Sequence, residues 1–80
     1  MYQIWLYPVE AVIENLDYET RELIISQLEK WSQIVVFDRR TQPRGYSIAP
    51  VETPQYRGIL CLVDHIHQTI IVLEFLPKVE

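Results

Sequence analysis

Two apolar runs in the C-terminal half of the chain, at residues 59–63 and 69–76, most constrain the fold. Each is far shorter than the roughly 18 apolar residues that a membrane-spanning helix needs. Both are rich in β-branched residues, and a short polar segment at 64–68 separates them. This pattern predicts a β-hairpin with 64–68 as its turn, and we expect the hairpin at the centre of a small sheet.

The chain has 80 residues, which predicts one domain over 1–80. Its hydrophobic content of 49% is enough for one core and excludes a disordered chain. The single cysteine, Cys61, lies within the first apolar run, so it is expected to be a reduced core residue. The first residues lack the basic start of a signal peptide, which together with the lone cysteine predicts a cytoplasmic protein with no membrane contact.

The N-terminal half predicts a strand followed by helical structure. Residues 2–7 are apolar on both faces of a strand, which predicts that both faces are covered. Pro8 suits the first position of a helix over 9–16, and Asp17 is a plausible N-cap for a helix over 18–32. These are either two short helices or one bent helix. The apolar residues at helical spacing in the second segment include Ile24, Leu28 and Trp31.

Further strands are expected after the helices. The β-branched run 34–37 predicts a strand, 43–45 a turn, and 46–48 a short strand. Pro50 and Pro54 keep the next stretch out of a central strand. The order β-α-α-β-β-β-β predicts an α+β fold, with two N-terminal helices on one face of a mostly antiparallel, four- to five-stranded sheet.

Two parts of the chain resemble the RelE/ParE toxin family. Residues 7–17, YPVEAVIENLD, are similar to the family's first strand exit, and residues 19–24, ETRELI, resemble the start of its second helix. The segment that begins at Tyr56 and Arg57 and ends at 71–73 is similar to the family's ending, in which tyrosine and arginine open a strand, a turn follows, and a last strand closes. The resemblance covers nearly the whole chain and implies a RelE-like fold with a curved sheet.

The same resemblance implies a toxin of a toxin–antitoxin module, paired with a cognate antitoxin protein. Family members act in two ways: some are mRNA interferases that cut message on the ribosome, and others poison DNA gyrase. Neither activity implies a cofactor. The alternative for this chain is a non-catalytic binding module, either a gyrase-type poison or a degenerate relative that acts only through a protein partner.

Cleavage of RNA by its own 2′-hydroxyl needs a base, a cation that stabilises the phosphorane, and an acid. Arg57 matches the strand-entry arginine with which ribonuclease members hold the scissile phosphate. Tyr46 and Tyr56 are candidates for proton transfer, and the catalytic hypothesis rests on these three residues. The candidates for binding the nucleic acid are Arg39, Arg40, Arg44 and Lys78.

Other features favour the binding alternative. The net charge is −4, which opposes phosphate binding. Residues 1–32 hold six acids and two bases, whereas residues 39–57 hold four arginines and one acid. Ser47 and Ala49 occupy places where ribonuclease members often carry lysines. Trp5 is expected in the core or at an interface, and the apolar first strand also suggests a homodimer.

A metal site is not expected. His65 and His67 lie two residues apart and could share a strand face, but the sequence shows no third ligand beside them. They remain further candidates for proton transfer in the ribonuclease hypothesis.

Overall fold

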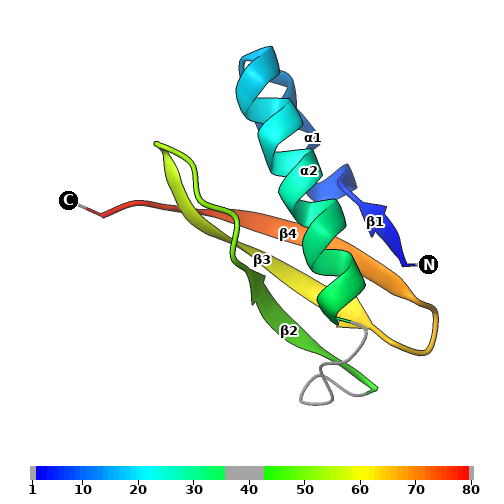
Figure 1. Ribbon diagram of the computed structural model, residues 1–80. Coiled ribbons are helices and arrows are strands. Elements are labelled where there is room, and N and C mark those ends of the chain that lie inside the picture. Colours follow the sequence, from blue (N-terminus) through cyan, green and yellow to red (C-terminus); the bar gives the residue numbers. More distant parts are fainter. Residues whose placement is uncertain (1, 36–42, 80) are drawn as a thin grey trace.

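The computed structural model describes residues 2–35 and 43–79. The elements in chain order are β1 (Gln3–Trp5), the 3-10 helix η1 (Tyr7–Val9), α1 (Glu10–Glu14), α2 (Tyr18–Val35), β2 (Arg44–Ala49), β3 (Tyr56–Asp64) and β4 (Thr69–Pro77). The predicted α+β class is confirmed: N-terminal helices pack on a four-stranded, mostly antiparallel sheet (Figure 1).

The predicted hairpin is confirmed at the centre of this sheet. The strand order is β1-β4-β3-β2, so β3 and β4 are the two inner strands. Both pairings of β3 are antiparallel, whereas β1 runs parallel to β4. The chain reverses between Asp64 and Thr69, and Gln68 takes a left-handed backbone conformation there, with φ of 51°.

The second helix begins at residue 18 as predicted, whereas the helix predicted over 9–16 is shorter and starts at Glu10, after the 3-10 helix η1. Pro8 lies in the first turn of η1, and α1 and α2 are separate helices rather than one bent helix. Asp17 caps α2, because its Oδ2 accepts a hydrogen bond from the Thr20 backbone N–H at 3.1 Å and its Oδ1 accepts one from the Thr20 hydroxyl at 2.6 Å. These bonds, the hydroxyl one first, lower the pKa of Asp17.

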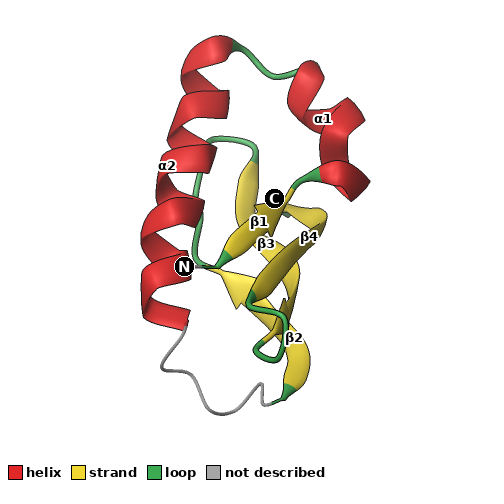
Figure 2. Ribbon diagram, turned by 90° about the vertical axis from the view of Figure 1, so that its right-hand side faces the viewer, coloured by secondary structure: helices red, strands yellow, loops and turns green. Residues whose placement is uncertain are grey.

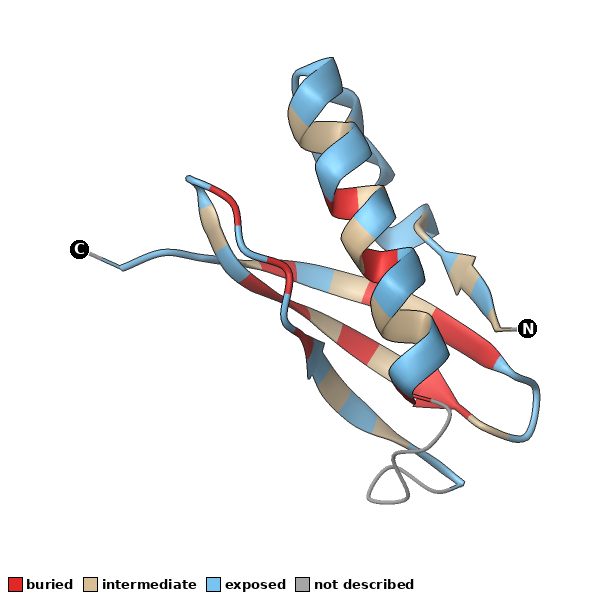
Figure 3. Ribbon diagram, viewed as in Figure 1, coloured by how far each residue is buried: buried red, intermediate tan, exposed pale blue. Residues whose placement is uncertain are grey.

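The core lies between α2 and one face of the sheet (Figures 2 and 3). From β3 and β4 it takes alternate side chains, as expected for strands with one buried face. Ile24 and Leu28 supply the apolar face of α2, each 1% exposed, and the predicted helical spacing is confirmed. The buried hydrophobic residues that the sheet contributes to this core are Ala49, Ile59, Cys61, Val63, Ile70, Val72 and Phe75.

Three predictions about the strands are wrong. The turn predicted at 43–45 overlaps β2, which begins at Arg44 and is therefore longer than the predicted strand 46–48. Residues 34 and 35 are the last turn of α2 rather than a strand, and the rest of the predicted strand, 36–37, lies outside the described residues. Val35 stands seven residues after Leu28, so it continues the buried helical stripe, and this packing overrides its β propensity. The first strand is also not covered on both faces, since Gln3 and Trp5 are exposed while Ile4 is half-buried.

Across the described ranges 2–35 and 43–79, no helix is long and apolar enough to span a bilayer.

Candidate functional site: the open face of the sheet

The sheet has one face that no described helix covers, and we call it the open face. Residues paired across neighbouring strands point to the same face, and successive residues of a strand alternate between faces. Because Cys61 and Val63 point into the helical core, their neighbour Leu62 points the other way. The strand register therefore defines the side chains of the open face.

One apolar row crosses all four strands of the open face. Tyr46 of β2 pairs with Leu62 of β3, Leu62 pairs with Ile71 of β4, and Ile71 pairs with Trp5 of β1. The two aromatic side chains at the ends of the row are the most open, with Tyr46 70% and Trp5 51% exposed. Leu62 and Ile71 are half-buried between them. The row is an exposed apolar band with an aromatic residue at each end.

A second apolar row runs beside the first. Ile48 pairs with Leu60, and Leu60 pairs with Glu74. Ile48 is 54% exposed, and Glu74 ends this row with an exposed carboxylate. A bulge in β4 follows, since Leu60 pairs with Glu74 but Cys61 pairs with Val72. The bulge leaves Leu73 unpaired beside Glu74 and bends the strand locally.

The third row is polar and closes the open face near the hairpin turn. Arg44 pairs with Asp64, Asp64 with Thr69, and Thr69 with Gln3. Asp64 is buried, and its Oδ1 accepts hydrogen bonds from the backbone N–H groups of Ile66 at 2.9 Å and His67 at 3.1 Å. Asp64 is thus a residue that holds the turn, and Arg44 is the exposed charge of this row.

Two histidines beside that turn bond to different side chains. His67 Nδ1 lies 2.8 Å from Asp64 Oδ2, and this side-chain hydrogen bond is the main reason that the pKa of Asp64 is lowered, followed by the backbone bond from the same residue. His65 Nδ1 lies 2.6 Å from the Tyr2 hydroxyl. No cluster of three metal-ligating side chains occurs in the part of the chain that the structure describes.

The structure places the three residues of the catalytic hypothesis in different surroundings. Arg57 is exposed at a bulge where β3 begins, and it makes no ion pair within the described residues. Its neighbour Tyr56 turns to the core and packs edge-on against Phe75, with ring centroids 5.1 Å apart. Tyr46 pairs with Leu62, five positions along β3 from Arg57, which corresponds to roughly 17 Å at the rise of a strand.

The predicted nucleic-acid contacts are similarly spread. Arg44 pairs with Asp64, seven positions along β3 from Arg57, which is roughly 23 Å. Lys78 lies at the Arg57 end, where its Nζ forms an ion pair with Glu52 Oε1 at 3.2 Å. Arg39 and Arg40 lie outside the described residues. Arg44 therefore lies at one end of the sheet and Arg57 and Lys78 lie at the other, so these candidate cations do not form one cluster.

This arrangement suits the binding of an apolar partner better than the binding of a phosphate. The paired rows of the open face present one arginine and two carboxylates, those of Asp64 and Glu74, around an apolar centre. The sequence indicates Tyr46 as a candidate site residue and predicts Trp5 in the core or at an interface. It does not show that the two residues end the same row. The period-two pattern of Arg44, Tyr46 and Ile48 gives the face of β2, whereas the partners in the row depend on the register.

A scan of protein-family models finds no match to this chain, and searches of curated proteins and of solved structures also find none.

Proposed function

We propose that this chain is a toxin-type binding protein of a toxin–antitoxin module that acts by holding a protein partner on the open face, without catalysis. The observation that carries the proposal is the row Trp5–Ile71–Leu62–Tyr46, an apolar band with exposed aromatic ends. Exposed apolar bands with aromatic residues and few charges are typical of protein interfaces. The resemblance to the RelE/ParE family supplies the biological setting.

The positions of the cations support a binding role over RNA cleavage. A phosphorane needs pre-organised positive charge within hydrogen-bond distance. Arg57 and Arg44 are separated by roughly 23 Å along the sheet, so these two guanidinium groups do not meet at one phosphate. The net charge of −4 opposes the approach of an RNA backbone as well.

Expression in a bacterial host with three matched variants tests the proposal. We expect the wild-type chain to arrest growth, and Tyr46→Glu to relieve the arrest by placing a charge in the apolar band. Tyr18→Glu is the control, because Tyr18 is also a tyrosine, is 71% exposed and lies at the start of α2 on the helical side. Tyr18→Glu and Arg57→Ala should arrest growth as the wild type does.

The opposite pattern favours an mRNA interferase. Relief by Arg57→Ala but not by Tyr46→Glu, together with cleavage of ribosome-bound message by the purified chain, would overturn the binding proposal. Absence of arrest by the wild-type chain would count against a toxin. Size-exclusion chromatography of the lone chain shows whether it self-associates, and loss of that association in Tyr46→Glu would place a second copy on the open face. Co-purification with the product of a neighbouring gene tests for an antitoxin.

A further inference from the structure

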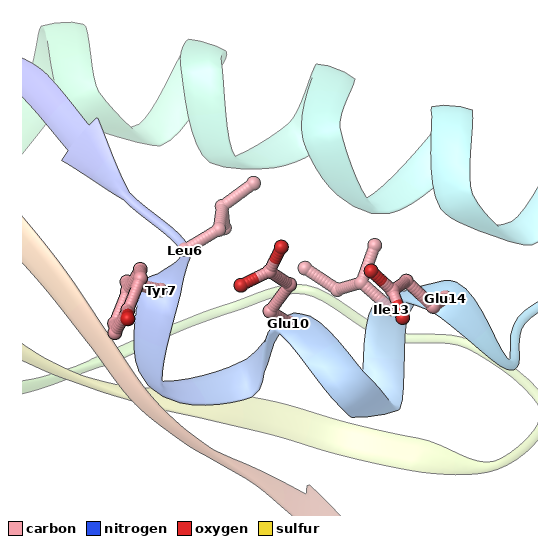
Figure 4. A pocket seen from close by; sticks show the side chains of 5 residues that line it. All are labelled: Leu6, Tyr7, Glu10, Ile13 and Glu14. Atoms are coloured by element: carbon pink, nitrogen blue, oxygen red, sulfur yellow. The ribbon is translucent and has the colours of Figure 1, made fainter.

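A hollow lies along the segment that leads from β1 through η1 into α1. It has a volume of about 410 Å³ and is lined by Leu6, Tyr7, Glu10, Ile13 and Glu14. In Figure 4, Leu6, Glu10 and Ile13 project from their segment toward α2. A second hollow of about 140 Å³ adjoins it through Leu6 and is lined also by Ile4, Ile25, Leu28 and Glu29. We call the two hollows together the helix groove.

The helix groove has an apolar floor and an acidic rim. Five of its lining residues are leucine or isoleucine, namely Ile4, Leu6, Ile13, Ile25 and Leu28. The charged lining residues are Glu10, Glu14 and Glu29, all three exposed, and within residues 2–35 and 43–79 none of them forms an ion pair. Among the residues that the structure describes, no base lines either hollow.

The charges around the helix groove are not compensated by its neighbours. Glu10 and Glu14 are one helical turn apart on α1, a spacing at which like charges repel. Arg21 lies one turn before Ile25 on α2, but it is half-buried and donates a hydrogen bond from Nη2 to the Leu16 carbonyl at 3.4 Å. A cation brought by a partner would relieve this repulsion.

We propose that the helix groove binds a basic amphipathic segment of a partner protein. Apolar side chains of that segment occupy the floor around Leu6 and Ile13, and its lysines or arginines pair with Glu10, Glu14 and Glu29. Three carboxylates at the rim repel phosphates and anionic lipid surfaces, so nucleic acid and membrane are poor occupants. A second copy is the competing occupant, because its residues 1–32 carry the same excess of acids but its residues 39–57 carry four arginines and one acid. Size-exclusion chromatography of the lone chain tests for it, and self-association that Glu10→Lys with Glu14→Lys abolishes would replace the partner protein by a second copy.

This inference does not rest on the function proposed for the open face. The floor of the helix groove includes Leu28 of α2, which packs on the face of the sheet opposite to Tyr46. The two surfaces can therefore be tested one at a time, and Tyr46→Glu should leave binding at the helix groove unchanged.

The test is an NMR titration of the isotope-labelled full chain with two synthetic helical peptides. One carries leucines at i, i+3, i+4 and i+7 with lysines on both sides, and the other has glutamates in place of the lysines. We expect the lysine peptide to bind about tenfold more tightly, to shift the amide signals of Leu6, Glu10 and Ile13, and to lose affinity as salt is raised.

Charge reversal supplies the matched variants. Glu10→Lys with Glu14→Lys should reverse the preference, so that the glutamate peptide binds more tightly. Glu19→Lys with Glu52→Lys changes the net charge equally at exposed positions that do not line the helix groove, and it should leave the preference as in the wild type. Circular dichroism of each double variant serves as the control for folding.

Four results of these titrations would overturn the proposal. The first is equal binding of the two peptides, and the second is signal changes confined to the open face. The third is the same loss of preference in the Glu19 and Glu52 variant, which would show that only net charge matters. Butylamine serves as a small-cation probe, and if it gives the same signal changes as the lysine peptide at the same concentration, the occupant is a small amine instead of a protein segment.

Discussion

Ile48 packs over Gly58 so closely that a Cβ added at residue 58 would lie 2.9 Å from Ile48 Cγ2 and 3.4 Å from the Ala49 carbonyl oxygen. Ile48 is β-branched, so it cannot move its Cγ2 without changing χ1. The absence of a side chain at residue 58 therefore allows Ile48 and Ala49 of the edge strand β2 to pair with β3 at this position.

Gly58→Ala should lower the free energy of unfolding by about 1–3 kcal/mol through overpacking. Ile48→Ala removes the obstructing methyl group, and in its background Gly58→Ala should cost less, with a coupling energy of about 0.5 kcal/mol or more. Urea denaturation of the wild type, both single variants and the double variant measures this cycle. Additive effects would show that Ile48 does not set the requirement for glycine.

Acid should destabilise the protein in part through Asp64. Hydrogen bonds from His67, the side-chain bond first, lower the pKa of this carboxyl below its ordinary value of 3.8. A carboxyl with a lowered folded-state pKa contributes stability that is present above the unfolded-state pKa and is lost as the pH falls through the folded-state pKa. The contribution of Asp64 should therefore be complete at neutral pH and disappear below about pH 4.

Asp64→Asn separates this effect from that of the other carboxyls. The variant should be less stable than the wild type at pH 7, and the difference should shrink as the pH is lowered from 5 to 2.5, measured by urea denaturation at each pH. Asp17→Asn should show a similar trend, because the pKa of Asp17 is also lowered. A difference at residue 64 that stays constant with pH would contradict the charge argument.

The features of the fold that the sequence predicts correctly are local ones. The hairpin, the Asp17 cap and the buried face of α2 follow from short-range rules of spacing and capping, and all were predicted. The end of α2 was predicted wrongly, because two signals conflict at Val35. Its β-branched neighbours favour a strand, whereas its spacing from Leu28 favours a helix. Burial against the sheet decides the outcome.

The open face depends on register, which the sequence pattern does not contain. Tyr46 and Trp5 are 41 positions apart in the chain, and they share a row only because Leu62 and Ile71 pair in the hairpin. Arg44 and Arg57 belong to the same basic stretch of the sequence. The antiparallel pairing of β2 with β3 nevertheless places them at opposite ends of the sheet. The pairing of long strands thus separates residues that composition groups together.

Leu28 and Leu23 give a matched test of how α2 is docked. Leu28 is 1% exposed beneath the helix, whereas Leu23 is 44% exposed on its outer side. Leu28→Ala should cost about 2–5 kcal/mol through lost burial and the cavity left behind. Leu23→Ala should change the free energy of unfolding by about 0.5 kcal/mol or less.

Thermal and urea denaturation of the two leucine variants measure these costs. A domain of this size has a total stability of only about 5–10 kcal/mol, so Leu28→Ala should lose a large share of it. Equal costs at the two positions would mean that α2 does not pack on the sheet through the stripe that includes Ile24 and Leu28.

Cys61 should be chemically silent in the folded protein. Its side chain is 0% exposed in the core, and burial raises the pKa of the thiol to about 12. At pH 8 the thiolate, which is the reactive form, is then about one part in ten thousand of the thiol.

A disulfide reagent such as Ellman's reagent should therefore modify Cys61 only as fast as the core opens. In concentrated guanidinium chloride the reaction should be complete within the mixing time. Leu28→Ala should speed the reaction by about tenfold for each 1.4 kcal/mol of stability that it loses, whereas Leu23→Ala should leave the rate nearly unchanged. Fast labelling of the wild-type chain without denaturant would place this thiol at the surface and contradict the packing of β3 against α2.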